Sequence, residues 1–139
     1  MARRDFIAIF SVILLACGCG EAPPFDFVPV SGRATLDGQP LIEVAIDFVP
    51  KAGEDGMAGP RSYAVTDADG RFELELSRPA GRSGAVPGKH TVFFLDKPNP
   101  DAKNADAPDA FLPTVPEKYQ AGVPFTVPTE GTDAANFDL

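Results

Sequence analysis

Hydrophobic and polar residues alternate with a period of two along most of the chain after residue 29, and this pattern predicts short β-strands. In the clearest case Val44, Ile46 and Phe48 are predicted to face inward from one strand. Ile42, two residues earlier, continues the same pattern. The end of Val86–Asp96 is apolar on both faces, which is typical of a central strand. The predicted strands lie within seven segments: Val30–Leu36, Ile42–Pro50, Arg61–Thr66, Arg71–Leu76, Val86–Asp96, Val123–Pro128 and Ala135–Leu139.

Turn-forming residues separate these segments, as expected for a fold of short strands. Asp37-Gly38 favours a tight hairpin turn, and Asp67–Gly70 predicts another turn between two strands. Lys51–Pro60 predicts a loop, and Asp96–Tyr119, rich in Pro, Asp and Ala, predicts a loop longer than most compact domains contain. The chain has 15 Pro and 13 Gly, and it offers no amphipathic helix of useful length after the N-terminal segment. These features predict an all-β fold, a seven-stranded β-sandwich of two sheets.

The N-terminal segment has the features of a secretion signal. A basic start at Arg3 and Arg4 precedes the apolar run Phe6–Ala16. As a helix this run would span roughly 16 Å, about half of the ~30 Å hydrocarbon core of a bilayer, so it is short for a membrane anchor. Its length suits the hydrophobic region of a signal peptide, and residues 1–16 are therefore predicted to be cleaved from the mature protein.

The apolar run ends in Leu14-Leu15-Ala16-Cys17, which resembles the lipobox of bacterial lipoproteins. In that family the cysteine thiol receives a diacylglycerol, and a signal peptidase cuts the chain just before it. The resemblance implies lipid attachment at Cys17, with Cys19 as the second candidate because its lipobox-like stretch begins with Ala16 instead of leucine. The alternative is an ordinary cleaved signal peptide. With lipid at Cys17, the Gly- and Pro-rich residues 17–29 would form a flexible tether to a domain at 30–139.

Other roles fit the two cysteines less well. A disulfide between Cys17 and Cys19 would close a very small ring, because residues i and i+2 of an extended chain hold their Cβ atoms too far apart. A zinc site needs about four ligands, and His90 is the one other soft candidate in the sequence. The C-x-C spacing also differs from the C-x-x-C spacing of redox pairs.

The strand and turn segments together resemble carboxypeptidase-regulatory-like domains of transthyretin-like topology, and most closely the short bacterial envelope lipoproteins that carry one such domain. The resemblance rests on the stretches VSGRATLDGQPL, TDADGRFEL and VPGKHTV and on the late Pro116–Tyr119, and it covers Val30–Leu139. It implies a Greek-key β-sandwich after a cleaved lipoprotein signal peptide. Because its motifs mark only the positions of strands and turns, the resemblance implies a fold but no activity.

Asp67 and Asp69 are the candidates for a metal site, but their spacing departs from that of a calcium loop. Gly70 directly follows the second aspartate, and Leu76 stands where the calcium-binding glutamate would be expected. We therefore interpret this stretch as a turn and predict neither a metal nor a cofactor. A small-ligand, carbohydrate or calcium-binding domain that uses acidic loops, here or at Asp101–Asp109, is the alternative function.

The sequence does not predict an enzyme. His90 is the only histidine, and it lies in phase with Val92 and Phe94, as expected of a packed, hydrogen-bonded strand residue. No nucleophile motif accompanies it. One enzyme of the transthyretin-like fold, 5-hydroxyisourate hydrolase, relies on several histidines, and the resemblance therefore does not extend to that activity.

The long loop at 96–119 is the candidate contact region, in which Phe111, Leu112 and Tyr119 are the residues expected to contact a partner. The competing interpretation is a surface insertion that Tyr119 pins to the sandwich. A net charge of −8 weighs against binding to nucleic acid. The sequence thus predicts a lipid-anchored, extracytoplasmic, non-catalytic structural or interaction module of the cell envelope, at the periplasmic face or the outer membrane. Its candidate partners are the membrane through the lipid, a cell-wall polymer, a polysaccharide or another envelope protein.

Overall fold

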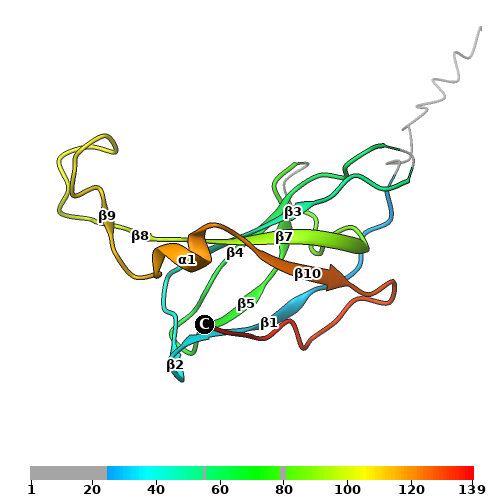
Figure 1. Ribbon diagram of the computed structural model, residues 1–139, viewed down its shortest axis with the longest axis horizontal. Helices are drawn as coiled ribbons and strands as arrows, with labels where there is room; N and C mark the ends of the chain where they lie inside the picture. The colour runs from blue at the N-terminus through cyan, green and yellow to red at the C-terminus, as the bar shows by residue number, and fades with distance from the viewer. Residues whose placement is uncertain (1–24, 55, 79–80) are drawn as a thin grey trace, which may run out of the picture.

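The computed structural model of the protein describes residues 25–54, 56–78 and 81–139, so the predicted signal peptide and the candidates Cys17 and Cys19 lie outside the described residues. The described chain consists mainly of β-strands (Figure 1), which confirms the predicted all-β class. Its elements are β1 (Ser31–Leu36), β2 (Gln39–Pro40), β3 (Ala45–Pro50), β4 (Ser62–Val65), β5 (Arg71–Glu73), β6 (Glu75–Leu76), β7 (Gly88–Leu95), β8 (Lys97–Pro98), β9 (Phe111–Leu112), α1 (Glu117–Gln120), β10 (Val123–Val127) and β11 (Phe137–Asp138).

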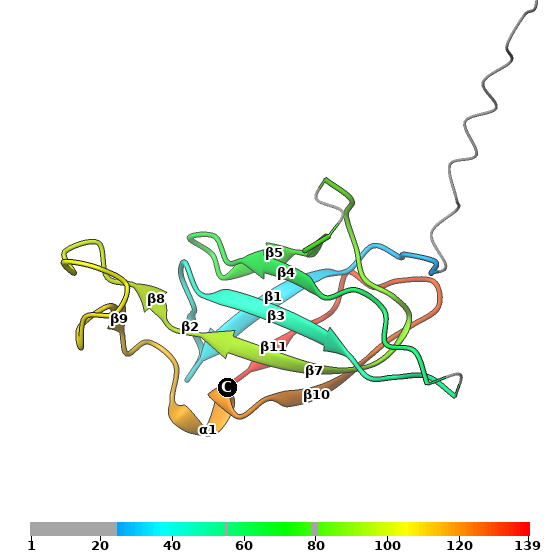
Figure 2. The same ribbon diagram turned by 90° about the horizontal axis from the view of Figure 1, so that it is seen from above.

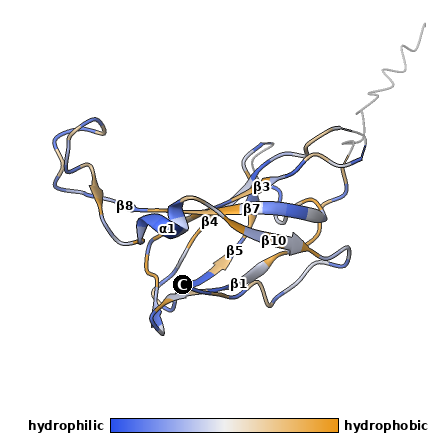
Figure 3. Ribbon diagram, viewed as in Figure 1, coloured by the Kyte–Doolittle hydropathy of each residue, from blue (hydrophilic) through white to orange (hydrophobic). Residues whose placement is uncertain are grey.

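Two larger sheets form the body of the domain. One is antiparallel with the strand order β10-β7-β3-β4-β6, and in the other β11-β1-β2 is extended by β5, which also pairs with β1. The strand β7 lies between β10 and β3, which confirms the central strand predicted from its apolar end. Figure 3 shows this end of β7, towards β8, as hydrophobic. The first strand β1 and the last strand β11 run parallel to each other.

Phenylalanine rings join the two larger sheets. Phe48 of β3 has its ring centroid 6.3 Å from that of Phe72 and 6.1 Å from that of Phe137, both of which belong to the other sheet. The rings of Phe94 and Phe137 lie 5.2 Å apart in an edge-to-face arrangement. Such aromatic pairs contribute stability beyond the burial of their surface. The hydrophobic core therefore lies between these sheets.

Each of the seven predicted segments contains a strand, and the predicted turns at Asp37-Gly38 and Asp67–Gly70 are confirmed. The residues Asp37 and Gly38 both have positive φ, 50° and 79°, which is the geometry of a two-residue hairpin turn, here between β1 and β2. The segment Arg71–Leu76, predicted as one strand, is divided between the sheets. Its first part, β5, pairs with β1, and its second part, β6, pairs with β4. The chain thus crosses from one sheet to the other at the fully buried Leu74.

The prediction that Ile42 faces inward is wrong, because its side chain is 45% exposed. The strict alternation begins only at Val44, and Val44, Ile46 and Phe48 are fully buried as predicted. The cause is the backbone of Glu43, which has a φ of +57° and so interrupts the extended chain before β3. The Glu43 side chain forms an ion pair with Lys97, the first residue of β8.

The segment Asp96–Tyr119, predicted as one long loop, contains the hairpin of β8 and β9 and the start of α1. The carboxylate of Asp96 closes the base of this hairpin. Its Oδ1 accepts the backbone N–H groups of Thr114 at 2.9 Å and Val115 at 2.8 Å, and its Oδ2 accepts the side-chain amide of Gln120 at 2.9 Å. The sequence did not reveal this hairpin because strands of two residues are too short to show an alternating pattern.

The β8–β9 hairpin lies at one end of the long axis of the molecule, and the first described residues, in blue, lie at the opposite end (Figures 1 and 2). Val28 is already part of the domain, because its N–H donates to the carbonyl of Ala85 at 2.9 Å and its carbonyl accepts the N–H of Ala85 at 3.0 Å. Residue 28 therefore already forms backbone hydrogen bonds with the domain. The chain enters the fold at the end farthest from the hairpin.

Candidate functional site

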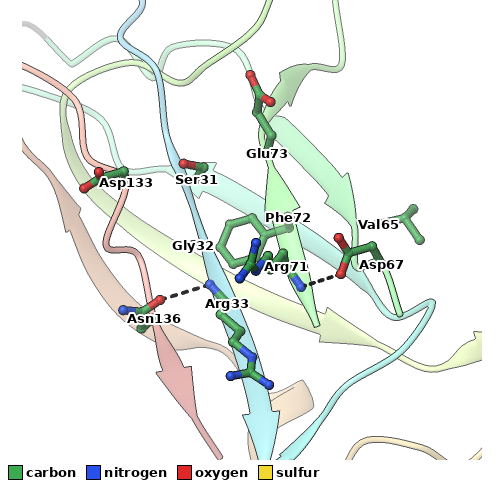
Figure 4. A pocket seen from close by; sticks show the side chains of 10 residues that line it. All are labelled: Ser31, Gly32, Arg33, Val65, Asp67, Arg71, Phe72, Glu73, Asp133 and Asn136. Carbon is green, nitrogen blue, oxygen red and sulfur yellow. Dashed lines mark hydrogen bonds between the residues drawn. The ribbon is translucent and has the colours of Figure 1, made fainter. Parts of the chain in front are cut away.

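The pair of strands β1 and β5 carries an open hollow of about 570 Å³ on its outer face, and Figure 4 shows the ten residues that line it. In the strand register Arg33 lies opposite Arg71, and Ser31 lies opposite Glu73. Phe72, between them in sequence, turns into the core and is 5% exposed. The alternation of the strands thus places Ser31, Arg33, Arg71 and Glu73 together on the exposed side.

The two arginine side chains diverge within this hollow. The Arg33 side chain extends along β1 away from Arg71 (Figure 4), and its Nε donates to the carbonyl of Asp69 at 2.8 Å. The backbone N–H of Arg33 donates to Oδ1 of Asn136 at 3.0 Å. Arg71 is left at the centre of the hollow, with the carboxylates of Glu73 and Asp133 at its edges. Such a set of donors and acceptors suits a small, hydroxyl-rich ligand more than a purely anionic one.

Asp67, a sequence candidate for metal binding, stabilises the turn between β4 and β5. Its Oδ1 accepts the backbone N–H groups of Asp69 at 2.8 Å and Arg71 at 2.9 Å, and Gly70 adopts the positive φ of 74° that the turn needs. These two hydrogen bonds, first that from Arg71, lower the pKa of Asp67 below 3.8, and the positive charges of Arg71 and Arg33 lower it further. In the described ranges no group of three or more His, Cys, Asp or Glu side chains could hold a metal ion.

His90 lies in the core, which confirms the predicted packed, hydrogen-bonded strand residue. It is 1% exposed, and its ring centroid lies 5.8 Å from that of Phe48. Its Nδ1 donates to the carbonyl of Gly88 at 3.0 Å, so the neutral ring leaves Nε2 as a buried acceptor that has no partner in the described part of the chain. Burial lowers the pKa of His90 below 6.5, and the hydrogen bond to Gly88 opposes this shift only in part.

This burial makes the stability of the domain depend on pH. Around pH 6.5 the unfolded chain binds this proton more readily than the folded chain does, so the free energy of unfolding should fall as the pH drops below about 7. We expect His90→Leu to flatten this slope in urea unfolding at a series of pH values. Asp67 does not contribute to the slope over this pH range, because its lowered pKa lies below the range. If the free energy of unfolding varies equally with pH in the two proteins, His90 is not the cause of the pH dependence.

The structure separates the three predicted contact residues. On the hairpin, Phe111 is 56% exposed and Leu112 is 38% exposed. Tyr119, in α1, is partly buried and packs against the core, with Nζ of Lys118 lying 4.5 Å from its ring centroid. Tyr119 therefore fastens the segment to the domain, as the competing interpretation of the sequence proposed, while Phe111 and Leu112 are free to contact another molecule.

The hairpin that carries Phe111 and Leu112 has a defined conformation. The Asn99 backbone N–H donates to the carbonyl of Ala110, and its side-chain amide donates to the carbonyl of Asp109, both at 2.8 Å. Ala110 is buried, although it lies next to the exposed Phe111. The two exposed apolar residues thus lie on a structured hairpin. Less conformational entropy is therefore lost when a partner binds them.

A second hollow, of about 640 Å³, lies where the chain enters the domain, and the sequence analysis did not find it. Its lining combines the apolar Phe25 and Met57 with Lys51 and Lys89. These residues are far apart in sequence and alternate with no common pattern, so only the fold brings them together.

The helix α1 has four residues, and the described ranges contain no membrane-spanning helix. No family model, curated protein or solved structure matches this chain.

Proposed function

We propose that this protein is a lipid-anchored, extracytoplasmic module of the cell envelope that presents its β8–β9 hairpin to a partner protein. The observation that carries the proposal is the position of the exposed Phe111 and Leu112, at the end of the molecule opposite to the first described residues (Figures 1 and 2). A lipid at Cys17 would hold the other end at the membrane. The hairpin would then point away from the bilayer, towards other molecules of the envelope.

The fold that we propose is a transthyretin-like β-sandwich. Two sheets packed through phenylalanine rings, with the first and last strands side by side, support this assignment together with the sequence resemblance. Rigid sandwiches of this kind commonly use the loops at their ends for recognition. The proposed role is therefore non-catalytic, and the domain acts as the support for the hairpin.

The chemistry of the hairpin indicates the kind of partner. Phe111 and Leu112 are apolar anchors, and the exposed carboxylates of Asp101, Asp106 and Asp109 lie on the same hairpin segment. A buried apolar centre with a charged rim is the usual organisation of a protein–protein interface. The matching surface is an apolar groove edged with lysine or arginine, which favours another envelope protein over a neutral polysaccharide.

Capture experiments with hairpin variants test the proposal. The full acylated chain, immobilised in detergent, is incubated with a solubilised envelope fraction and, in separate experiments, with purified cell-wall polymer and polysaccharide. Replacing Phe111 or Leu112 with serine should weaken capture of a protein partner on the order of tenfold or more, because anchors at the centre of an interface dominate binding. Tyr63→Ser is the matched control, since Tyr63 is 44% exposed but lies on a strand of the body, outside both hollows described above.

Two results would count against this function. If the hairpin variants capture the partner as well as the parent chain does, the hairpin is not the binding surface. If only the polymers are captured, and equally by all variants, the domain binds the envelope through a different face.

A further inference from the structure

We propose that the hollow where the chain enters the domain binds the headgroup phosphate of an anionic phospholipid in the membrane that holds the anchor. This inference rests on the lipid anchor of the proposed function and assigns a second role to the opposite end of the molecule. We name this hollow the basal pocket and define it by Phe25, Lys51, Glu54, Met57, Val86 and Lys89, which belong to its lining.

The position of the basal pocket follows from the way the chain enters the fold. Phe25 lines the pocket, and three residues later Val28 is hydrogen-bonded to Ala85 in both directions. The tether therefore ends on the domain beside the pocket. From Cys17 to Phe25 there are eight residues, which span no more than about 29 Å even when fully extended. Lipid at Cys17 would thus keep the pocket close to the headgroups of the bilayer.

The two lysines of the pocket are held next to each other by the backbone. The N–H of Lys51, just after β3, donates to the carbonyl of Lys89 in β7 at 2.8 Å. Both side chains are exposed, and in the described part of the chain neither forms an ion pair. An ammonium group without a fixed carboxylate is available to a phosphate, and two of them together outweigh the single carboxylate of Glu54.

The apolar part of the pocket lies beside this charge. Met57 is 53% exposed, Phe25 is partly exposed and Val86 forms the buried floor at 6%. The loop packs closely here, because a Cβ added at Gly59 would lie 2.8 Å from Cγ1 of Val86. A surface that joins exposed apolar side chains to lysines matches the boundary between headgroups and acyl chains, where the two environments meet.

Charge complementarity selects a phospholipid as the occupant. The protein carries a net charge of −8, so an anionic membrane repels most of its surface. Lysine near an anionic bilayer gains attraction that falls off within a Debye length of about 10 Å, so only an end held at the membrane benefits. The basal pocket would orient the domain with its long axis away from the bilayer and its hairpin outward.

Tryptophan fluorescence tests this orientation, because the chain has no tryptophan of its own. Met57→Trp places a single reporter in the pocket of the full acylated protein, and Phe111→Trp places one at the opposite end. On phosphatidylglycerol vesicles with brominated acyl chains we expect strong quenching of the Met57→Trp emission and none for Phe111→Trp. Phosphatidylcholine vesicles with the same bromination should quench Met57→Trp less, and added inorganic phosphate should not displace a headgroup held in the bilayer.

The lysines are tested in the Met57→Trp background. Lys51→Gln with Lys89→Gln should reduce quenching on phosphatidylglycerol to the phosphatidylcholine level. Lys103→Gln with Lys118→Gln, which removes the same charge elsewhere, should leave it unchanged. Protein that sediments with vesicles but shows equal quenching at both reporters, or no dependence on the lysine pair, overturns the basal pocket alone. Protein that does not sediment with the vesicles overturns the anchor as well.

Discussion

Phe48→Ala is expected to destabilise the domain by about 3–5 kcal/mol, the usual cost of removing a buried phenylalanine ring. The ring of Phe48 is fully buried and contacts the rings of Phe72 and Phe137 in one sheet and of Phe125 and His90 in its own. Its loss leaves a cavity between the sheets. Urea unfolding followed by far-UV circular dichroism measures the change.

Phe111→Ala is the matched control for this prediction. It removes the same side chain from a position that is 56% exposed, and its effect should stay within roughly 0.5 kcal/mol. Since single domains are stable by only about 5–15 kcal/mol, the Phe48 variant should lose a large part of its total stability. Similar losses in the two variants would mean that the core is not centred on Phe48.

Cys17→Ser is expected to release the protein from the membrane. Each buried methylene of an acyl chain contributes about 0.8 kcal/mol to membrane binding, so the chains of the proposed diacylglycerol would supply nearly all the membrane affinity of this acidic domain. After fractionation the parent protein should be found with membranes, and the variant should be found in the soluble fraction. Mass spectrometry of the N-terminal peptide should show the lipid on the parent protein only.

Cys19→Ser serves as the control, because it leaves the better lipobox intact and should keep both the lipid and the membrane association. The reverse result, with lipid lost from Cys19→Ser and retained by Cys17→Ser, would move the attachment site to Cys19. An unmodified thiol at both positions of the parent protein would remove the lipid anchor from the proposed function.

Local patterns in the sequence were sufficient to locate the longer strands, but not the two-residue strands β2, β8 and β9. The alternation of Val44, Ile46 and Phe48 placed β3 correctly, because the burial of one sheet face determines such a pattern directly. Asp67 and Gly70 predicted their turn for the same local reason. Ile42 was misplaced because the positive φ of Glu43 has no signature in the polarity of the neighbouring residues.

The candidate sites depended on contacts between distant parts of the chain, and these were less predictable. Phe111 and Leu112 were recognised as contact candidates from their composition, but their separation from Tyr119 became visible only with the hairpin. Lys51 and Lys89 belong to different strand regions, and their proximity depends on the register between β3 and β7. The polarity pattern of one sequence does not reveal which residues pair across the two strands, so the basal pocket could not be predicted.

The crossing of the chain at Leu74 makes the two sheets one cooperative unit. Because β5 and β6 are joined through one residue and belong to different sheets, neither sheet can separate at this corner without breaking the hydrogen bonds of Leu74 to Val30 and Gly84. Opening at this corner therefore requires the loss of contacts in both sheets. A domain that resists opening at this corner exposes fewer cleavable segments there, which would suit the extracytoplasmic location that we propose.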